Sequence, residues 1–372
     1  MVTTDMTIRQ GTPQPPLRIL VLGDSYCPSS ALRPAFTDLA RQHTVDFGDV
    51  TDDAAWQPTT PSELRLREYL GTPSQVIASL AGHDVLVVQG APVSDAVLDA
   101  SPALQLVCCA RGGPVNVDVQ AATERGIPVV TTPGKNADAV ADLTLGLMIA
   151  LARRLPDATR FIDSGAEFGH DNYEGAKWFG HDLAGHTLGL IGYGQVGHRV
   201  ARRAIGFGLR LLVYDPYVAP EAIRTADIEP CDLGRLLASS DFVSLHARLT
   251  PDSRGLLGSA EFAAMRPGAY LINTARHELV DEVALEAAMA AGRLGGLALD
   301  VATPSPAVGR HPLLAFPNVV ILPHLGGSTD ETLRHGGEMA AADIERFRAG
   351  LPMQNVANRA ALAARTEPAA VS

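Results

Sequence analysis

The chain has 372 residues, a formal net charge of −11 and 46% hydrophobic residues. This length predicts two or three domains with enough apolar material for their cores. The acidic balance argues against a nucleic-acid or anionic-membrane surface, so we expect neither partner. The four cysteines show no CxxC or metal-ligand spacing. They predict no disulfide framework and no metal site, and they favour a reducing, cytoplasmic location.

The two ends of the chain differ from the rest. Residues 1–16 are polar and contain proline, without a cationic stretch that leads into an apolar core. We therefore expect a disordered tail there and no signal peptide. Residues 351–372 are expected to form a polar, Ala-rich C-terminal tail. Every long apolar stretch is interrupted by glycine, proline or charge, which predicts no membrane span.

Strand-like and helix-like segments alternate from residue 17 to residue 130. This alternation predicts a first doubly wound parallel sheet of the α/β class. The expected strands cover residues 17–22, 85–88, 104–109 and 127–130, and the expected helices cover 74–80, 94–100 and 117–124.

A second parallel sheet is expected from residue 137 to residue 323. It begins with a helix over 137–154 that is apolar nearly all round, which indicates burial in a core or at a subunit contact. Residues 156–184 are expected to form a surface connection, and 328–349 a last helix. The expected strands are 188–191, 209–214, 242–245, 269–273, 296–301 and 319–322, with helices at 195–207 and 282–291.

A glycine motif directly follows the expected strand at 188–191. Gly192, Gly194 and Gly197 form a GxGxxG pattern that opens the expected helix. The first glycine permits a tight turn, the second lets the backbone approach a pyrophosphate, and the third lets the helix pack close to the strand. The start of the helix, with Gln195 and Val196, offers free N–H groups to the phosphates.

An acidic residue supports the same interpretation. Asp215 ends the next expected strand, 18 residues after Gly197. A carboxylate at this place accepts the two ribose hydroxyls of a dinucleotide and repels a 2′-phosphate, which favours NAD over NADP. We therefore predict an NAD site; the alternative is a structural turn in another kind of α/β domain.

Ionisable residues follow other expected strands, where ligands of open α/β sheets bind. Arg276 could contact a carboxylate with two parallel hydrogen bonds, or be a surface arginine paired with Glu278 or Asp281. His324 could supply a proton to a reacting carbonyl, although a lone histidine is more often structural. Consecutive glycines after Arg111 could form an anion-binding nest or a plain turn.

Several motifs together resemble the D-isomer-specific 2-hydroxyacid dehydrogenases, and are similar to the phosphoglycerate dehydrogenase branch. The resemblance covers roughly residues 75–350. Its motifs are the glycine pattern with Asp215, Ser244–His246, Met265–Arg276, Leu279–Glu282, Ala298–Val301 and Pro323–Gly327, together with Arg125–Val129 and Asn136 followed by Val140–Asp142.

The resemblance implies two Rossmann-like domains, with the nucleotide domain inserted into the substrate domain. Residues 17–135 and 324–350 would form the substrate-binding domain, and 136–323 the NAD-binding domain. The active site would lie in the cleft between them, and closure would exclude water. The resemblance also implies a homodimer through the nucleotide domain, to which the apolar 142–153 segment is suited.

The resemblance further implies hydride transfer between NAD(H) and a 2-hydroxy or 2-oxo acid. Arg276 would hold the carboxylate and polarise the keto group, and His324 would protonate the developing alkoxide. The implied cofactor contacts are Gly192, Gly194, Gln195, Val196, Gly197, Asp215, His246, Thr274, Ala275, Asp300, Gly326 and Gly327. The implied substrate contacts are Gln89, Gly90, Gly112, Gly113 and Asn136, with the backbone around Ala91.

Three departures from the family pattern affect these expectations. The family has a glutamate five residues after Asp300, to pair with the histidine, and this chain has Ser305. A serine carries no charge to stabilise an imidazolium, so we expect reduction to favour a more acidic pH or to be slow. Arg248 stands where the family often has proline. The segment after residue 350 is too short for the extra regulatory domain of long phosphoglycerate dehydrogenases, so we expect no feedback through such a domain.

An alternative function remains open at this point. The chain could be a non-catalytic or weakly active NAD-binding sensor that kept the fold and lost the glutamate. A sensor needs neither Arg276 nor His324, so the presence of both favours the enzyme. The sequence leaves the 2-hydroxy acid open, including whether it is phosphorylated; for a phosphorylated one, Arg111 is the cation that can be named.

Overall fold

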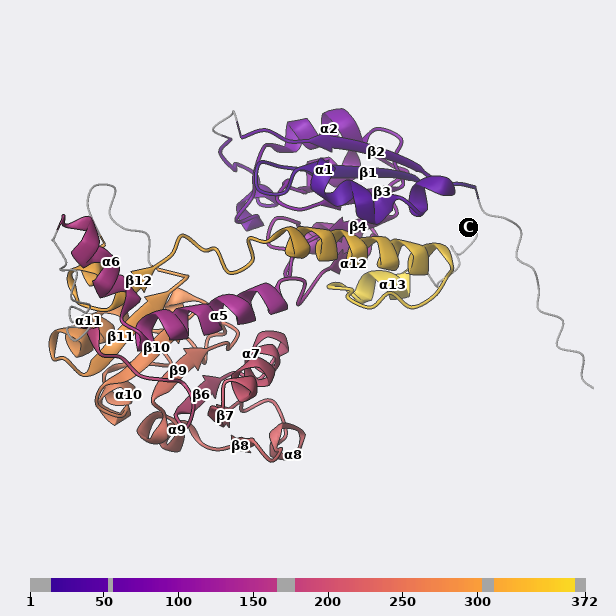
Figure 1. Cartoon of the computed structure of the whole chain (residues 1–372). Coiled ribbons are helices and arrows are strands. Elements are labelled where there is room, and N and C mark those ends of the chain that lie inside the picture. The colour runs from indigo at the N-terminus through magenta and orange to yellow at the C-terminus, as the bar shows by residue number, and fades with distance from the viewer. Residues whose placement is uncertain (1–14, 53–55, 166–177, 303–310, 365–372) are drawn as a thin grey trace, which may run out of the picture. The chain divides into compact units, whose positions relative to one another are not determined.

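The computed structural model describes residues 15–52, 56–165, 178–302 and 311–364. The chain divides into two compact units (Figure 1). One unit comprises residues 1–135 together with 330–372, and the other comprises residues 136–329. The second unit is thus inserted into the sequence of the first, and each holds one parallel sheet. This arrangement confirms the expected doubly wound α/β class with two Rossmann-like units.

The first unit contains a five-stranded parallel sheet with the order β2-β1-β3-β4-β5. Most of its strands are continuous apolar runs, as expected for a sheet covered on both faces. The edge strand β2 was not predicted, because its residues alternate between exposed and half-buried and form no apolar run. The strands are β1 (Arg18–Gly23), β2 (Thr44–Asp49), β3 (Val85–Val88), β4 (Leu106–Cys109) and β5 (Val129–Thr131).

Helices of the first unit come from both pieces of its sequence. The long helix α12 (Asp330–Arg348) packs on α1 and η1, and a Cβ at Gly337 would lie 2.9 Å from the Ala35 Cβ, so this close approach requires glycine. The others are α1 (Ser29–Leu32), η1 (Arg33–Phe36), η2 (Leu39–Arg41), η3 (Glu63–Arg65), α2 (Pro73–Leu80), α3 (Asp95–Asp99), α4 (Val119–Glu124) and α13 (Ala360–Ala364).

The segment after α12 is more ordered than a simple tail. Val356 forms an antiparallel bridge with Val130. The Asn358 side chain donates to the Ile127 carbonyl at 2.9 Å and accepts from the Val129 N–H at 2.7 Å. Residues 355–358 therefore extend the five-stranded sheet beyond β5, and the tail predicted for 351–372 is wrong for this part of it.

The second unit contains a seven-stranded parallel sheet with the order β12-β11-β10-β9-β6-β7-β8. The edge strand β8 was not predicted, because it has three residues, two of them Glu229 and Pro230. The strands are β6 (Thr187–Ile191), β7 (Arg210–Tyr214), β8 (Ile228–Pro230), β9 (Phe242–Leu245), β10 (Ala269–Asn273), β11 (Leu294–Leu299) and β12 (Val319–Ile321).

The sequence left open whether the apolar helix at 137–154 is buried in a core or at a subunit contact. This helix is α5 (Ala137–Ala152). It lies against α7 and over β10 and β11, and its buried residues belong to the core of this unit (Figure 1). The other helices are α6 (Leu155–Asp163), α7 (Gln195–Gly206), α8 (Pro220–Ile223), α9 (Leu233–Ser239), α10 (Ser259–Ala264), η5 (His277–Leu279), α11 (Glu282–Ala290) and η6 (Pro312–Ala315). No helix among the described residues is long and apolar enough to cross a membrane.

Helix α6 corrects the surface connection expected over 156–184. Arg154 begins it with a φ of 53°, and Pro156 occupies the first turn, where proline is tolerated. Asp157 is buried and accepts hydrogen bonds from the Arg154 guanidinium at 2.8 Å and from the Asn318 N–H at 2.7 Å. The bond from Asn318, which lies 161 positions away, ties the helix to the rest of the unit, and the local sequence does not reveal it. Residues 166–177 of the expected connection lie outside the described residues.

Candidate active site

The turn between β6 and α7 is tight on its inner side and open on its outer side. Gly192 has a φ of 98°, and a Cβ there would lie 2.6 Å from the Ala247 nitrogen. A Cβ at Gly197 would lie 2.2 Å from the Gly192 carbonyl oxygen. A Cβ at Gly194 would meet nothing within 4 Å, so this glycine leaves space free for a ligand.

The first turn of α7 keeps its N–H groups available. Gly194 is the N-cap and supplies no side-chain acceptor, while the first N–H groups of a helix have no partner within it. Gln195 is exposed, and its side chain accepts from the Arg199 guanidinium at 2.8 Å. Free N–H groups, a helix dipole and an open Gly194 suit the pyrophosphate of a dinucleotide.

Asp215 lies at the end of β7 and is half-buried. Its Oδ2 accepts from the Tyr193 N–H at 2.7 Å, and its Oδ1 accepts from the Tyr217 N–H at 2.9 Å. Each carboxylate oxygen can accept a second hydrogen bond. The carboxylate is therefore fixed beside the glycine turn with capacity left for ribose hydroxyls.

His246 lies against the same turn from the end of β9. Its N–H donates to the Ile191 carbonyl at 2.8 Å, and its ring Nε2 lies 2.9 Å from the Ser244 Oγ. Burial lowers the pKa of His246 to about 3, because a buried site disfavours the charged imidazolium. The ring is therefore neutral at physiological pH and can give a polar contact without adding charge.

Three candidate residues follow three neighbouring strands. Arg276 follows β10, Asp300 follows β11 and His324 follows β12, and these strands are adjacent and parallel. Neighbouring strands lie about 4.8 Å apart, and parallel strands end at the same edge of the sheet. The fold therefore brings a guanidinium, a carboxylate and an imidazole to one short stretch of this edge.

The Asn273 side chain fixes the turn that carries Arg276. The Asn273 side chain donates to the Arg276 carbonyl at 2.8 Å and accepts from the Ala275 N–H at 3.0 Å. The Thr274 hydroxyl lies 3.2 Å from the Thr144 hydroxyl in the interior. The Thr274 side chain therefore faces the interior, and the Ala275 N–H is already bonded to Asn273, so neither group is presented to a ligand.

The Arg276 side chain is exposed, and its Nη1 donates to the Ala275 carbonyl at 2.7 Å. Glu278 pairs with His277 at 3.2 Å and with Arg254 at 3.9 Å, and Asp281 caps α11. Among the described residues no carboxylate forms an ion pair with Arg276. The guanidinium is therefore free to bind an acidic ligand, and the alternative of a surface ion pair with Glu278 or Asp281 finds no support.

Asp300 fixes the loop that carries His324. It is 1% exposed, and its two oxygens accept from the Leu325 N–H at 2.6 Å and from the Gly326 N–H at 2.7 Å. His324 has a φ of 61° and an exposed side chain, and its ring has no hydrogen bond or ion pair to any described residue. Ser305, which stands at the position of the family glutamate, lies outside the described residues.

Gly326 and Gly327 follow His324 and allow close packing. A Cβ at Gly326 would lie 2.7 Å from the Asp300 Oδ2, and a Cβ at Gly327 would lie 3.0 Å from the Asn136 Nδ2. Packing within the unit therefore accounts for glycine at both positions, independently of any cofactor contact. The clamp on the His324 loop was not predicted, since it depends on which strands are neighbours.

The expected substrate residues of the first unit follow β3 and β4. The Gly90 N–H donates to Asp24 at 2.7 Å, and Gly112 and Gly113 have open space where a Cβ would be. The buried Gln89 side chain accepts from the Lys135 Nζ at 3.4 Å. Sequence reasoning assigned no role to Asp24 or Lys135; the available signal was that lysine occurs at only two positions of the chain, 135 and 177.

Among the described residues there is no group of three or more histidine, cysteine, aspartate or glutamate side chains that could hold a metal ion.

Comparisons with known proteins show which family this chain resembles. A family model described as the NAD-binding domain of D-isomer-specific 2-hydroxyacid dehydrogenases matches residues 145–326. The chain is 37% identical over 285 residues to D-3-phosphoglycerate dehydrogenase of Archaeoglobus fulgidus, covering 76% of this chain and 53% of that protein. It is 36% identical over 277 residues to glyoxylate reductase of Korarchaeum cryptofilum, covering 72% and 80%.

A solved structure shows a similar fold. The TT0316 protein of Thermus thermophilus matches with a TM-score of 0.71 and 33% identity, covering 92% of this chain and all of that one. The chain spans about half the length of the D-3-phosphoglycerate dehydrogenases that it matches.

Proposed function

The chain belongs to the D-isomer-specific 2-hydroxyacid dehydrogenase family, and we propose that it interconverts a 2-hydroxy acid and a 2-oxo acid with NAD(H). The observation that supports this proposal is the placement of Arg276, Asp300 and His324 after three adjacent strands of the unit that carries the glycine turn. The match of residues 145–326 to the family's NAD-binding domain supports NAD as the cofactor.

The cofactor, when bound, supplies or takes up the hydride. Its pyrophosphate would rest on the backbone of Gly194, Gln195, Val196 and Gly197, and Asp215 would accept the ribose hydroxyls. The half-buried carboxylate of Asp215 would repel the 2′-phosphate of NADP. His246, Thr274, Ala275, Gly326 and Gly327 would contribute further cofactor contacts.

Arg276 would bind the substrate carboxylate with two parallel hydrogen bonds. Its exposed and unpaired guanidinium supports this role. Held in this way, the 2-oxo acid would present its keto oxygen to a proton donor, and the guanidinium would also polarise that carbonyl. Gln89, Gly90, Gly112, Gly113 and Asn136 would give further substrate contacts.

His324 would donate a proton to the keto oxygen as that oxygen becomes a hydroxyl, and would accept the proton in the reverse direction. Asp300 would act by positioning, because its oxygens hold the two backbone N–H groups that directly follow His324. A buried carboxylate with two short bonds is a stronger clamp than a neutral acceptor.

The experiment is NADH oxidation, followed at 340 nm, with a panel of 2-oxo acids. We expect turnover of at least one of them by the wild-type protein. His324→Gln should lower kcat by about 10²-fold or more, the usual contribution of a positioned acid. Arg276→Met should mainly lower kcat/KM for the 2-oxo acid. His277→Gln and Arg254→Met are the matched controls from the same region and should change turnover little.

NAD binding without turnover of any 2-oxo acid would reject the enzyme and favour the sensor alternative. If Arg276→Met and Arg254→Met lowered kcat/KM equally, the effect would come from the loss of positive charge in general and not from a specific contact of the Arg276 guanidinium.

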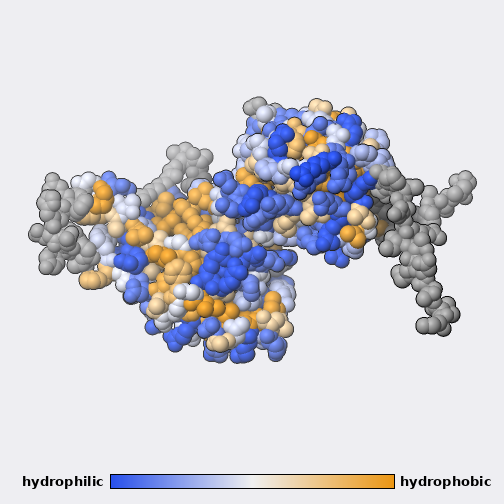
Figure 2. Space-filling model, turned by 45° about the vertical axis from the view of Figure 1, so that its right-hand side comes forward, coloured by the Kyte–Doolittle hydropathy of each residue, from blue (hydrophilic) through white to orange (hydrophobic). Residues whose placement is uncertain are grey.

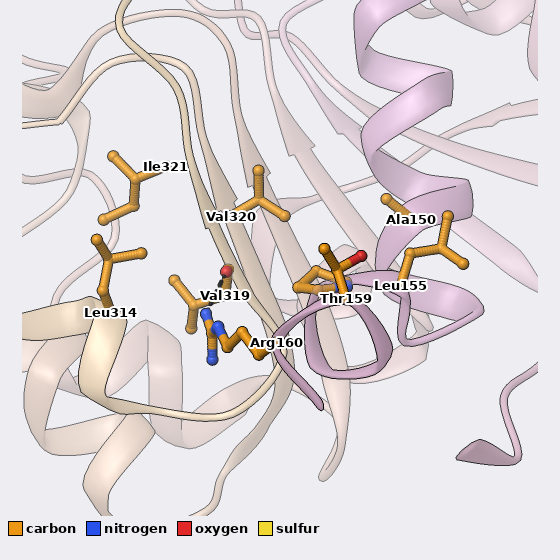
Figure 3. A pocket seen from close by; sticks show the side chains of 9 residues that line it. Ala150, Leu155, Thr159, Arg160, Leu314, Val319, Val320 and Ile321 are labelled. Atoms are coloured by element: carbon orange, nitrogen blue, oxygen red, sulfur yellow. Dashed lines mark hydrogen bonds between the residues drawn. The ribbon is translucent and has the colours of Figure 1, made fainter. Parts of the chain in front are cut away.

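We also propose that two copies associate through the nucleotide unit. An apolar hollow lies beside the edge strand β12 (Figure 3). There the Arg160 guanidinium donates to the Phe316 and Val319 carbonyls at 3.1 and 2.8 Å, so its polar end is engaged within the unit. Its lining residues are Ala150, Leu155, Pro156, Thr159, Arg160, Leu314, Val319, Val320 and Ile321.

Exposed apolar residues on this unit support the same proposal. Figure 2 shows broad apolar areas on the seven-stranded unit, and Leu155 and Ile162 of α6 are each 49% exposed. Contiguous apolar surface of this kind marks protein contacts. Light scattering should give the mass of a dimer for the wild-type protein and of a monomer for Val320→Glu; a monomeric wild type would reject the proposal.

The compartment that we propose is the cytoplasm. All four cysteines are free thiols, and three of them are buried. Free thiols are typical of a reducing compartment. Fractionation of the source cells would test this.

A further inference from the structure

Lysine is rare in this chain. The sequence contains 30 lysine and arginine residues, and only Lys135 and Lys177 are lysines. Lys135 belongs to the loop that follows β5, at the carboxyl edge of the five-stranded sheet, where open α/β sheets bind ligands. A lysine is a compact point charge, and arginine does not replace it without a change of geometry.

The Lys135 side chain is largely enclosed within the first unit. A Cβ at Gly336 of α12 would lie 3.0 Å from the Lys135 Cδ and 3.3 Å from its Nζ, so the lysine side chain lies close against the helix at this glycine. Burial is the largest effect on Lys135 and lowers the pKa of its ammonium, while the charge of the nearby Asp24 acts in the opposite direction.

The ammonium has few partners. Its described acceptor is the neutral Gln89 Oε1 at 3.4 Å, although an ammonium has three donors. The neighbouring thiols give no negative charge, because burial raises the pKa of both Cys27 and Cys109 to about 11. Among the described residues no carboxylate forms an ion pair with Lys135. A half-buried cation without a counter-ion is costly unless a ligand supplies one.

Arg111, the cation that the sequence offered for a phosphorylated substrate, has a different environment. Its guanidinium donates to the Glu68 carbonyl at 2.6 Å and forms an ion pair with the Glu68 carboxylate. Its charge is therefore already compensated. Among the described residues at this edge, Lys135 forms no ion pair whereas Arg111 does, and the open glycines Gly112 and Gly113 follow the neighbouring strand β4.

We propose that Lys135 determines substrate specificity by binding a second anionic group, a carboxylate or a phosphate, on the 2-oxo acid. This inference rests on the proposed function. A 2-oxo acid without a second charge would leave the ammonium uncompensated, whereas one with a second charge would pair with it.

The first test compares substrates with one and with two anionic groups. Oxaloacetate and 3-phosphohydroxypyruvate carry a second group, a carboxylate and a phosphate respectively, and pyruvate carries none. Wild-type protein should prefer one of the first two. Lys135→Met should lower kcat/KM for that substrate by roughly 100-fold, as expected for a lost charge-assisted contact, and should change pyruvate reduction less than about threefold.

The chain offers a matched control. Lys177→Met also removes one lysine charge, and its kcat/KM for each of the three substrates should equal that of the wild type. Equal losses for pyruvate and for the doubly charged substrate in Lys135→Met would overturn the inference, as would a wild-type protein that does not prefer a second charge.

A second test uses the unmodified protein and needs no turnover. With only two lysines, brief acetylation followed by peptide mass spectrometry reports on each of them separately. In the presence of NADH, malate or 3-phosphoglycerate should slow acetylation of Lys135 by about fivefold or more, and lactate should not. Lys177 serves as the internal reference.

The two tests separate the two proposals. Turnover of 2-oxo acids with no protection of Lys135 would overturn the lysine inference and leave the dehydrogenase standing. Protection of Lys135 without any turnover would support an anion site and reject the dehydrogenase.

Discussion

The backbone N–H of Tyr193 donates a 2.7 Å hydrogen bond to the Asp215 carboxylate. Tyr193 lies between the first two glycines of the turn, and Asp215 lies at the end of the neighbouring strand. The bond therefore ties the phosphate-binding backbone to the acid that would bind the ribose. The second oxygen of Asp215 is held by the Tyr217 N–H at 2.9 Å, so the carboxylate has a fixed direction.

This relationship predicts the effect of Asp215→Ala. Without the carboxylate, ribose hydroxyls lose an acceptor and a 2′-phosphate is no longer repelled. The ratio of kcat/KM for NADH to that for NADPH should fall by about 10- to 100-fold, which corresponds to roughly 1.4 to 2.8 kcal/mol. Asp215→Asn keeps an acceptor for one backbone N–H and serves as the control for turn geometry. An unchanged ratio in Asp215→Ala would remove this acid from the cofactor site.

A second prediction concerns the clamp on the His324 loop. Asp300→Ala would leave the Leu325 and Gly326 N–H groups without their acceptors, which costs about 1–3 kcal/mol for a buried group. His324 would no longer be held at a φ of 61°. We expect the free energy of unfolding to fall by about 2 kcal/mol and kcat by about 100-fold, since small displacements of catalytic groups have effects of this size.

The companion variant Asp300→Asn retains one of the two acceptors and should lie between the wild type and Asp300→Ala in both measurements. Urea unfolding and steady-state kinetics give the two quantities. If Asp300→Ala unfolded at the wild-type urea concentration and turned over at the wild-type rate, the positioning role would be wrong.

The fold could be predicted where apolar runs are continuous. Leu20 and Leu271 stand in such runs, and their strands β1 and β10 were found within two residues of their ends. The strands β2 and β8 were missed because edge strands bury less of their surface and need no such run. The tail beyond α12 was missed because its order comes from Asn358 and Val356 pairing with residues more than 200 positions away.

In the candidate site, too, local features could be predicted from the sequence and long-range contacts could not. The glycines of the turn were visible because their physical reason is local. The Asp300 clamp, the Glu68–Arg111 pair and the enclosure of Lys135 were not visible, because each joins segments that only the folded chain brings together. Residue type identified the candidate site residues. The strand order then showed that Arg276, Asp300 and His324 lie at one edge of the seven-stranded sheet.

A third prediction is a pH dependence of stability. The pKa of His246 is about 3 in the folded chain and close to 6.5 when unfolded. Between these values the unfolded chain binds a proton that the folded chain does not bind, so stability is lost as the pH falls below about 6.5. From pH 7 to pH 5 this residue should cost about 2 kcal/mol at most.

His246→Gln keeps a polar side chain next to Ser244 and removes the titration. Its free energy of unfolding should therefore fall less than that of the wild type over the same pH interval. Urea unfolding at pH 5, 6 and 7 provides the comparison. Parallel curves for the two proteins would mean that His246 becomes protonated in the folded chain.

The last prediction separates ligand binding from folding within the glycine turn. Gly194→Ala adds a methyl group where nothing lies within 4 Å, whereas Gly197→Ala places one 2.2 Å from the Gly192 carbonyl oxygen. Gly194→Ala should keep the wild-type stability within about 0.5 kcal/mol and weaken NADH binding about tenfold or more, because the methyl group would occupy the space of the pyrophosphate.

Gly197→Ala should lose about 2 kcal/mol or more of stability, since the added methyl group would force the backbone of the turn to shift. Urea unfolding and fluorescence titration with NADH measure both effects. If Gly194→Ala bound NADH as tightly as the wild type, the phosphates would not lie on the start of α7.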